Sequence, residues 1–291
     1  MKENCYNPIS LLMSIVHTSS RSIFIKLKNF LLFMLIYAVI VIVLNHKFHL
    51  IQGNIELGQF HLIFSFCLAI IISFRIKTAY ERWWEGRELW GTLVNNSRNL
   101  ALRLNKYIGL QNDQDLKNYI STFPLLLKYH LRRDKNRCRK IIANLGISYN
   151  EENYPLLLIQ KITNKVIHYR STNQISFEYY LTLDTHISAL TDILGGCEKI
   201  LNTPPPQGFR IFARFALSCY ILIFPFGWIQ AFELFIIPIL IIIIYVLLGL
   251  EIIAEEIETP FGNDYNDLDL DSYARNIENN INQIAKNADS R

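Results

Sequence analysis

The carboxylates that follow residue 250 are the groups whose type and spacing come closest to a chemical site. Two sets of acidic residues flank a turn at residues 260–262: Glu251, Glu255, Glu256, Glu258, Asp264, Asp267, Asp269 and Asp271. Close oxygen ligands on a turn are what Ca²⁺ requires. The turn lacks the glycine and the closing glutamate at the spacing of an EF-hand loop. From the chemistry alone, we favour an acidic turn that caps helices and pairs with basic neighbours.

Catalytic chemistry has no comparable candidate in the sequence. No nucleophile lies beside a base, no phosphate-binding loop is present, and the seven histidines form no recognisable ligand set. The five cysteines share no CxxC or metal-binding spacing. The net charge of +4 is too mild to indicate nucleic acid as the main partner. We therefore expect neither an enzyme nor a nucleic-acid-binding protein.

An aromatic and aliphatic stripe precedes residue 75. Phe66, Ile70 and Phe74 follow one another at intervals of four residues, so in a helix they stack on one face. A parallel stripe of small residues, Ser65, Ala69 and Ser73, would let a neighbouring helix approach closely. The usual interpretation of such a stripe is packing against another helix. We expect this helix to be enclosed by others.

The sequence becomes charged abruptly after the stripe. Arg75 and Lys77 come first, and acidic and basic residues then alternate with Trp83, Trp84 and Trp90. Aromatic rings and long basic side chains are at home at the headgroup boundary of a membrane. One helix is therefore predicted to leave a membrane and enter water. At least one of the two basic residues is expected to pair with Glu81 or Glu85, or to extend toward lipid headgroups.

Apolar residues are concentrated in a few runs, which is typical of an integral membrane protein. Four spans are predicted, near residues 30–44, 57–74, 209–229 and 232–250. Most Lys and Arg residues lie between the second and third spans, so this block and both termini are placed in the cytoplasm. The predicted segments are a cytosolic N-terminus (1–29), two spans (30–74), a cytosolic region (75–208), two spans (209–250) and an acidic turn with a tail (251–291).

The cytosolic region is predicted to be helical. Helical periodicity is visible in residues 116–129, 154–169 and 177–201, and β-alternation is absent. Residues 132–140 carry a cluster of six Lys and Arg residues, which we interpret as a solvated helix end and loop rather than as a site for anionic lipid or nucleic acid. The run NTPPPQG must end the helix that precedes it, because proline lacks a backbone donor.

Three long motifs resemble those of the prokaryotic branch of the bestrophin family. They are FRIKTAYERWWEGRELWGTLVNNSRNLA, GGCEKILNTPPP and ETPFGNDYNDLDLD, and they occur in the family's order with four spans in the family's places. The resemblance covers nearly the whole chain. It implies an all-α membrane protein with four transmembrane helices per subunit, a helical cytosolic region, and a homopentameric ion channel around a central pore.

The resemblance also implies where the pore is narrow. By position, the apolar neck within the membrane falls on Phe66, Ile70 and Phe74, with Arg75 and Lys77 at its rim. A second, cytosolic aperture falls on the helix that leads to the GGC segment. Spacing back from Cys197 places it at Leu181, with Tyr180 and Leu183 as alternative registers.

In animal bestrophins the acidic run after the fourth span forms a Ca²⁺ clasp. Asp264 and Asp267 occupy the positions whose side chains ligate calcium there, whereas Asn263, Tyr265 and Asn266 replace acidic residues. Prokaryotic relatives are generally described as lacking this calcium gate. We expect no cofactor, and we prefer a turn that docks the C-terminal tail on a neighbouring subunit to a Ca²⁺ site.

The resemblance implies passive conduction of small inorganic ions in the inner membrane, with the chain itself and lipid as the other partners. The edges of phenylalanine rings are positive and would favour anions such as chloride. Ile70 has no such edge, and a cation-conducting homologue is the alternative. A membrane-anchored scaffold without transport, which binds a partner through residues 132–140, is a more remote one.

Overall fold

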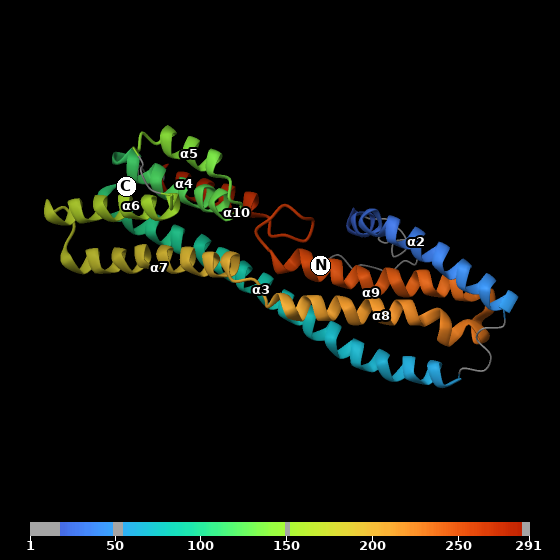
Figure 1. Cartoon of the computed structure of the whole chain (residues 1–291). Helices are drawn as coiled ribbons and strands as arrows, with labels where there is room; N and C mark the ends of the chain where they lie inside the picture. Colours follow the sequence, from blue (N-terminus) through green and yellow to red (C-terminus); the bar gives the residue numbers. More distant parts are fainter. Residues whose placement is uncertain (1–17, 49–54, 149–151, 287–291) are drawn as a thin grey trace, which may run out of the picture. The chain divides into compact units, whose positions relative to one another are not determined.

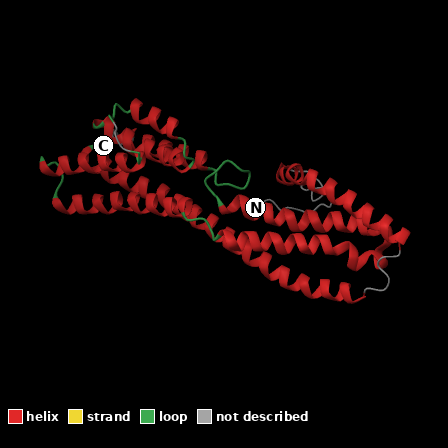
Figure 2. Ribbon diagram, in the orientation of Figure 1, coloured by secondary structure: helices red, strands yellow, loops and turns green. Residues whose placement is uncertain are grey.

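A computed structural model describes residues 18–48, 55–148 and 152–286. Every regular element in these ranges is a helix, and none of the described residues belongs to a strand (Figure 2). The prediction of an all-α protein is confirmed. Most of the predicted N-terminal segment, 1–29, lies outside the described residues, as do the last five residues of the tail.

The chain divides into two compact units. The first contains residues up to Glu81, residues Pro205–Glu258 and a short piece, Asp264–Asn266. The second contains Arg82–Pro204, Thr259–Asn263 and the residues from Asp267 onward. One long helix, α3 (Ile55–Ile108), contributes to both.

The first unit is apolar. It holds α2 (Thr18–Phe48), the first half of α3, α8 (Gln207–Phe232), the short 3₁₀ helix η2 (Glu233–Phe235) and α9 (Ile236–Glu258). Three stretches of the described residues, 23–48, 56–108 and 207–258, are long and apolar enough to cross a membrane. The third stretch comprises α8 and α9, which lie side by side and are joined through η2 (Figure 1). α8 continues to Phe232, beyond the predicted end of the third span at residue 229, and the short helix η2 that joins it to α9 lies at 233–235.

Close packing holds this unit together. Met34 and Ala38 of α2 are buried in one cluster with Leu240 and Ile244 of α9. α3 meets α8 at a pair of glycines: a Cβ atom added at Gly58 would lie 3.3 Å from the carbonyl oxygen of Gly227. Small residues at such a crossing allow two backbones to approach within a membrane, where water provides no driving force for association.

The second unit is an amphipathic helical bundle. It contains the end of α3, η1 (Leu110–Asn112), α4 (Gln114–Leu131), α5 (Lys135–Asn144), α6 (Tyr154–Ser171), α7 (Phe177–Asn202) and α10 (Leu270–Lys286). The three helices that periodicity predicted correspond to α4, α6 and α7. The prediction of a helix end and loop over 132–140 is wrong in part, because α5 begins at Lys135. α10 was not predicted, although its apolar residues recur at helical spacing.

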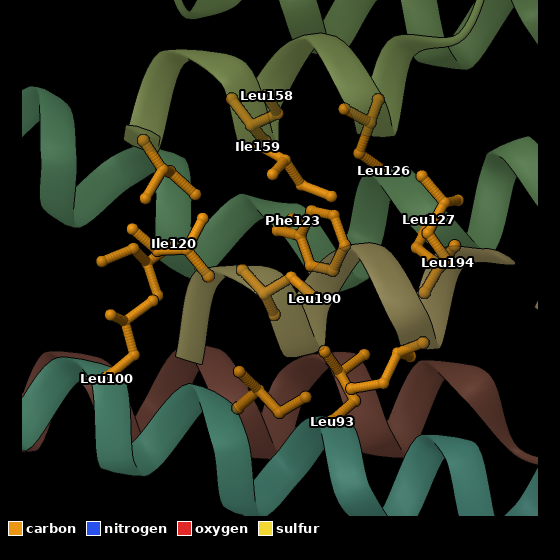
Figure 3. Packing of buried hydrophobic residues seen from close by; sticks show 14 of the residues in the cluster. Leu93, Leu100, Ile120, Phe123, Leu126, Leu127, Leu158, Ile159, Leu190 and Leu194 are labelled. Carbon is orange, nitrogen blue, oxygen red and sulfur yellow. The ribbon is translucent and has the colours of Figure 1, made fainter. Parts of the chain in front are cut away.

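Leucine and isoleucine side chains from α3, α4, α5, α6, α7 and α10 fill the core of this bundle, and Figure 3 shows part of it. Leu93 and Leu100 of α3 face the cluster, with Phe123 of α4, Leu158 of α6 and Leu190 of α7. Local signals fix the helix starts: Asp113, Asp134, Asn153 and Ser176 each accept a hydrogen bond from a backbone N–H in the first turn of α4, α5, α6 and α7. Burial supplies the packing energy, and the caps set the positions of the helix ends.

Candidate pore-lining face

One face of α3 in the first unit remains uncovered although it is apolar. Phe66 is 70% exposed, Ile70 43% and Phe74 59%. The same stretch of helix buries Leu68 and Ala79 on its other side. Single exposed apolar residues are ordinary, but an aligned row of large ones marks a surface that some other medium or molecule occupies.

The exposed residues line a shallow groove of about 280 Å³. It is lined by Phe66, Ala69, Ile70, Ser73, Phe74 and Lys77. The large-residue stripe and most of the small-residue stripe therefore share one surface. All six lining residues belong to α3, so on this face no second helix among the described residues provides the expected enclosure.

Of the two basic residues expected at the rim, only Lys77 lies on this face. Its ammonium is 3.8 Å from the carboxylate of Glu81, one turn further along the helix, and both side chains are well exposed. Arg75 is almost completely buried and forms ion pairs with Glu258 at 2.5 Å and Glu251 at 3.5 Å. A buried, doubly paired guanidinium projects little positive potential into the groove. The prediction that at least one of these two basic residues pairs with Glu81 or Glu85 is confirmed by Lys77, whereas the acids that pair with Arg75 were not indicated by the sequence.

The acidic end of α9 pairs with cations from three helices. Besides Arg75 of α3, Arg214 of α8 contacts Glu251 at 3.0 Å and Glu255 at 2.9 Å. Lys26 of α2 contacts Glu256. The predicted pairing of this acidic segment with basic neighbours is confirmed, and each of these pairs lies within the first unit.

The tryptophan-rich signature has a structural role that the sequence did not predict. Trp90 was expected at the headgroup boundary, but it is fully buried in the core of the second unit. Arg82 donates hydrogen bonds to the carbonyl oxygens of Ile200, at 2.6 Å, and Thr203, at 2.8 Å, and so satisfies the last turn of α7 before the prolines. The signature therefore bonds α3 to α7. It also marks the point along α3 where the sequence changes from apolar to charged.

The GGC motif is explained by close helix packing in the second unit. A Cβ atom at Gly196 would lie 2.9 Å from a methyl group of Leu89 on α3, whereas one at Gly195 would meet nothing within 4 Å. Cys197 is fully buried, and burial raises the pKa of its thiol to about 12, so it remains a neutral thiol. Only the second glycine is needed for contact with α3.

The structure separates the three registers considered for the cytosolic aperture. Leu183 is fully buried in the core of the second unit, and Tyr180 packs partly against that core. Leu181 is 48% exposed on α7. Among these residues only Leu181 has a side chain that is free to line an opening.

Half of the six basic residues at 132–140 form ion pairs within their own unit. Arg132 pairs with Asp271, Lys135 with Glu152 at 3.0 Å, and Arg137 with Asp134 at 3.2 Å. Arg139 donates a hydrogen bond to the hydroxyl of Tyr154. This arrangement disfavours a phosphate-binding patch, since the carboxylates would compete with the ligand.

The acidic turn does not fit a calcium site. In the described part of the chain, no three His, Cys, Asp or Glu side chains come together as metal ligands. The Asp264 carboxylate, which is half exposed, lies 3.5 Å from the Lys26 ammonium. Asp267 packs against the turn glycine, and a Cβ atom at Gly262 would lie 2.7 Å from its carboxylate. The sequence offered no signal for Lys26, which is more than 200 residues away along the chain.

A comparison with protein families decides the identity. Residues 5–283 match the family described as Bacterial/Fungal Bestrophin protein. This chain belongs to the bestrophin family. The resemblance seen in the three motifs is thereby confirmed over nearly the whole sequence.

Curated bestrophin relatives include channel-forming proteins of bacteria. A voltage-dependent anion channel-forming protein of Nostoc is 31% identical over 232 residues, which cover 76% of this chain and 75% of that protein. One from Synechocystis is 31% identical over 230 residues, with the same coverage of both chains. A third, from Escherichia coli K12, is 24% identical over 279 residues, 92% of this chain and 90% of its own.

Solved structures share the bestrophin fold. A bacterial bestrophin homologue from Klebsiella pneumoniae superposes with a TM-score of 0.78 at 23% identity and covers 89% of this chain and 98% of its own. The crystal structure of another membrane protein gives a TM-score of 0.80 at 22% identity, with the same coverage.

Proposed function

We propose that this bestrophin is the subunit of a homopentameric channel that conducts small inorganic anions such as chloride. The observation that carries the proposal is the uncovered apolar groove on α3, lined by Phe66, Ile70 and Phe74. In a ring of subunits these residues form a neck around a central pore. Ala69 and Ser73, beside them, let neighbouring copies of α3 approach closely.

An apolar neck selects by width, by wetting and by the dipoles that face inward. Phenylalanine rings whose edges point into the pore present partial positive charge to a passing ion. Lys77, on the same face, adds a positive charge at one end of the neck, only partly offset by Glu81. The names of the curated relatives, voltage-dependent anion channel-forming proteins, support the same sign of charge.

We also propose how the subunit lies in the membrane. The chain crosses the inner membrane four times, through α2, the first half of α3, α8 and α9, with both termini in the cytoplasm. Leu181 lines a second aperture on the cytosolic side, because its side chain is exposed, whereas Leu183 is buried and Tyr180 is partly buried against the core.

The test of ion selectivity is a reversal potential across bilayers that contain the purified protein under a KCl gradient. We expect a potential near the chloride equilibrium value. A potential near the potassium value would replace the proposal by the cation-conducting alternative. Absence of current from correctly assembled pentamers would favour the scaffold.

Replacement of Phe66, Ile70 and Phe74 by alanine tests the neck itself. We expect a higher conductance and weaker anion selectivity, because the constriction widens and loses its ring edges. The matched control replaces Phe33, Ile36 and Ile40 of α2, which are also exposed and apolar, by alanine. Equal conductance and selectivity in the two triple variants would contradict the assignment of the neck.

A further inference from the structure

The ammonium group of Lys26 lies between acidic side chains of the turn and of α9, where a bound metal ion would be expected. Nζ of Lys26, on α2, donates a hydrogen bond to Oε1 of Glu256 at 2.7 Å. It also lies 3.5 Å from Oδ1 of Asp264, in the turn. The one side chain therefore joins three parts of the first unit: α2, the end of α9 and the turn that follows it.

Glu256 needs this partner because it is buried. The residue is 4% exposed, although it lies in the last turns of α9. Lys26 binds one carboxylate oxygen, and the amide of Asn266 donates a hydrogen bond to the other at 2.7 Å. A buried carboxylate that loses its cation is strongly unfavourable, unlike one that is exposed to water.

The ligand set suits an ammonium better than a divalent metal. An ammonium has three donors, and here Glu256 and Asp264 provide two oxygen acceptors; the Lys26 side chain is 44% exposed, so water can reach the third donor. Ca²⁺ requires six to eight oxygen ligands. Asn266, which lies between the two aspartates of the turn, donates a hydrogen bond from its side-chain amide to Glu256 at 2.7 Å.

We propose that the Lys26 ammonium is the resident cation of this turn and ties α2 to the end of α9 and to residues 264–266. The turn is held permanently by the chain's own positive charge. Divalent cations therefore neither order it nor stabilise it. The proposal concerns folding contacts within the first unit and does not depend on which ion the channel conducts.

Thermal unfolding of the full-length protein in detergent tests the proposal. Lys26→Ala should lower the melting temperature by about 4 °C or more, because the buried Glu256 carboxylate loses its ion pair with the lysine. The matched control is Lys28→Ala, two residues further along the same helix, where the lysine is exposed and no described carboxylate pairs with it. This control should melt within about 1 °C of the wild type. Equal melting temperatures for the two variants would overturn the proposal.

A second variant separates loss of charge pairing from general damage to α2. Lys26→Ala combined with Glu256→Gln removes both charges and keeps an amide oxygen that can accept from Asn266. We expect the double variant to recover at least half of the lost stability, or to yield folded protein if Lys26→Ala alone does not. A double variant that is no better than Lys26→Ala would contradict the pairing.

The effect of calcium on the melting temperature is the third measurement. Addition of about 1 mM CaCl₂ should leave the melting temperature of the wild type unchanged, since the cation position is filled. A calcium-dependent increase in the wild type that Glu256→Gln abolishes would show that the turn takes a metal and would overturn the proposal.

Discussion

At the residue scale, α3 carries two kinds of contact: a row of apolar side chains on one face, and the buried ion pairs of Arg75. Phe66, Ile70 and Phe74 lie together because helical periodicity places residues four apart on one side, whatever surrounds the helix. The acids that pair with Arg75 come from α9, more than 170 residues along the chain, and no local pattern indicates them. Periodicity is a property of one helix, whereas an ion pair depends on how several helices pack.

Asp113 offers a residue-scale prediction with a pH dependence. Burial alone would raise the pKa of this carboxyl, but hydrogen bonds from the Leu116 N–H, the Tyr169 hydroxyl and the Lys165 ammonium outweigh burial and lower it. A folded-state pKa below the unfolded value of about 3.9 stabilises the fold above that pH, and the stabilisation is lost as the pH falls through the lowered value.

Asp113→Asn should therefore cost about 1–2 kcal/mol at neutral pH, because the amide keeps the helix cap but loses the ion pair with Lys165. The difference from the wild type should shrink as the pH falls below about 4. The control is Asp115→Asn, whose more exposed ion pair with the same lysine should contribute less than about 0.5 kcal/mol. Denaturant titrations from neutral to acidic pH measure both; a cost for Asp113→Asn that persists unchanged in acid would refute the ionic origin.

At the scale of elements, the sequence predicted α4, α6 and α7 within a few residues because each carries an apolar face between clear start and stop signals. α5 was missed because its sequence is dominated by charge and buries only Cys138 and Ile142. α10 was missed because it follows an acidic turn that was interpreted as the start of a tail. Where charged residues dominate a segment, the two or three buried apolar positions of a helix are hard to recognise in the sequence.

The two glycines of the GGC motif allow an element-scale prediction about helix contact. Gly196→Ala should destabilise the protein by about 1 kcal/mol, because the new methyl group must displace a Leu89 side chain that lies 2.9 Å away. Gly195→Ala should be neutral or stabilising by up to about 1 kcal/mol, since alanine favours the helix and meets no atom within 4 Å. Melting temperatures of the two variants in one detergent compare them directly. The reverse order would show that α7 does not pack on α3 through Gly196.

At the scale of the whole molecule, the sequence predicted an apolar part and a helical polar part, and the structure describes two compact units of those kinds. In the pentamer that we propose, the large residues of the α3 groove face the pore. The small residues beside them, Ala69 and Ser73, leave room for a neighbouring copy of α3 to approach.

Ala69→Leu provides the test of that surface. We expect a clear loss of intact pentamer, because the added side chain occupies the space that a neighbouring copy of α3 requires. The matched control is Ala231→Leu near the end of α8, where alanine is also exposed in the single chain; Ile242→Leu on α9 is a second, volume-conserving control. Size-exclusion chromatography with light scattering in mild detergent measures the yield of each assembly. Because all three positions are exposed, a general intolerance of larger side chains would lower the three yields alike, whereas packing of α3 on its neighbour lowers only that of Ala69→Leu.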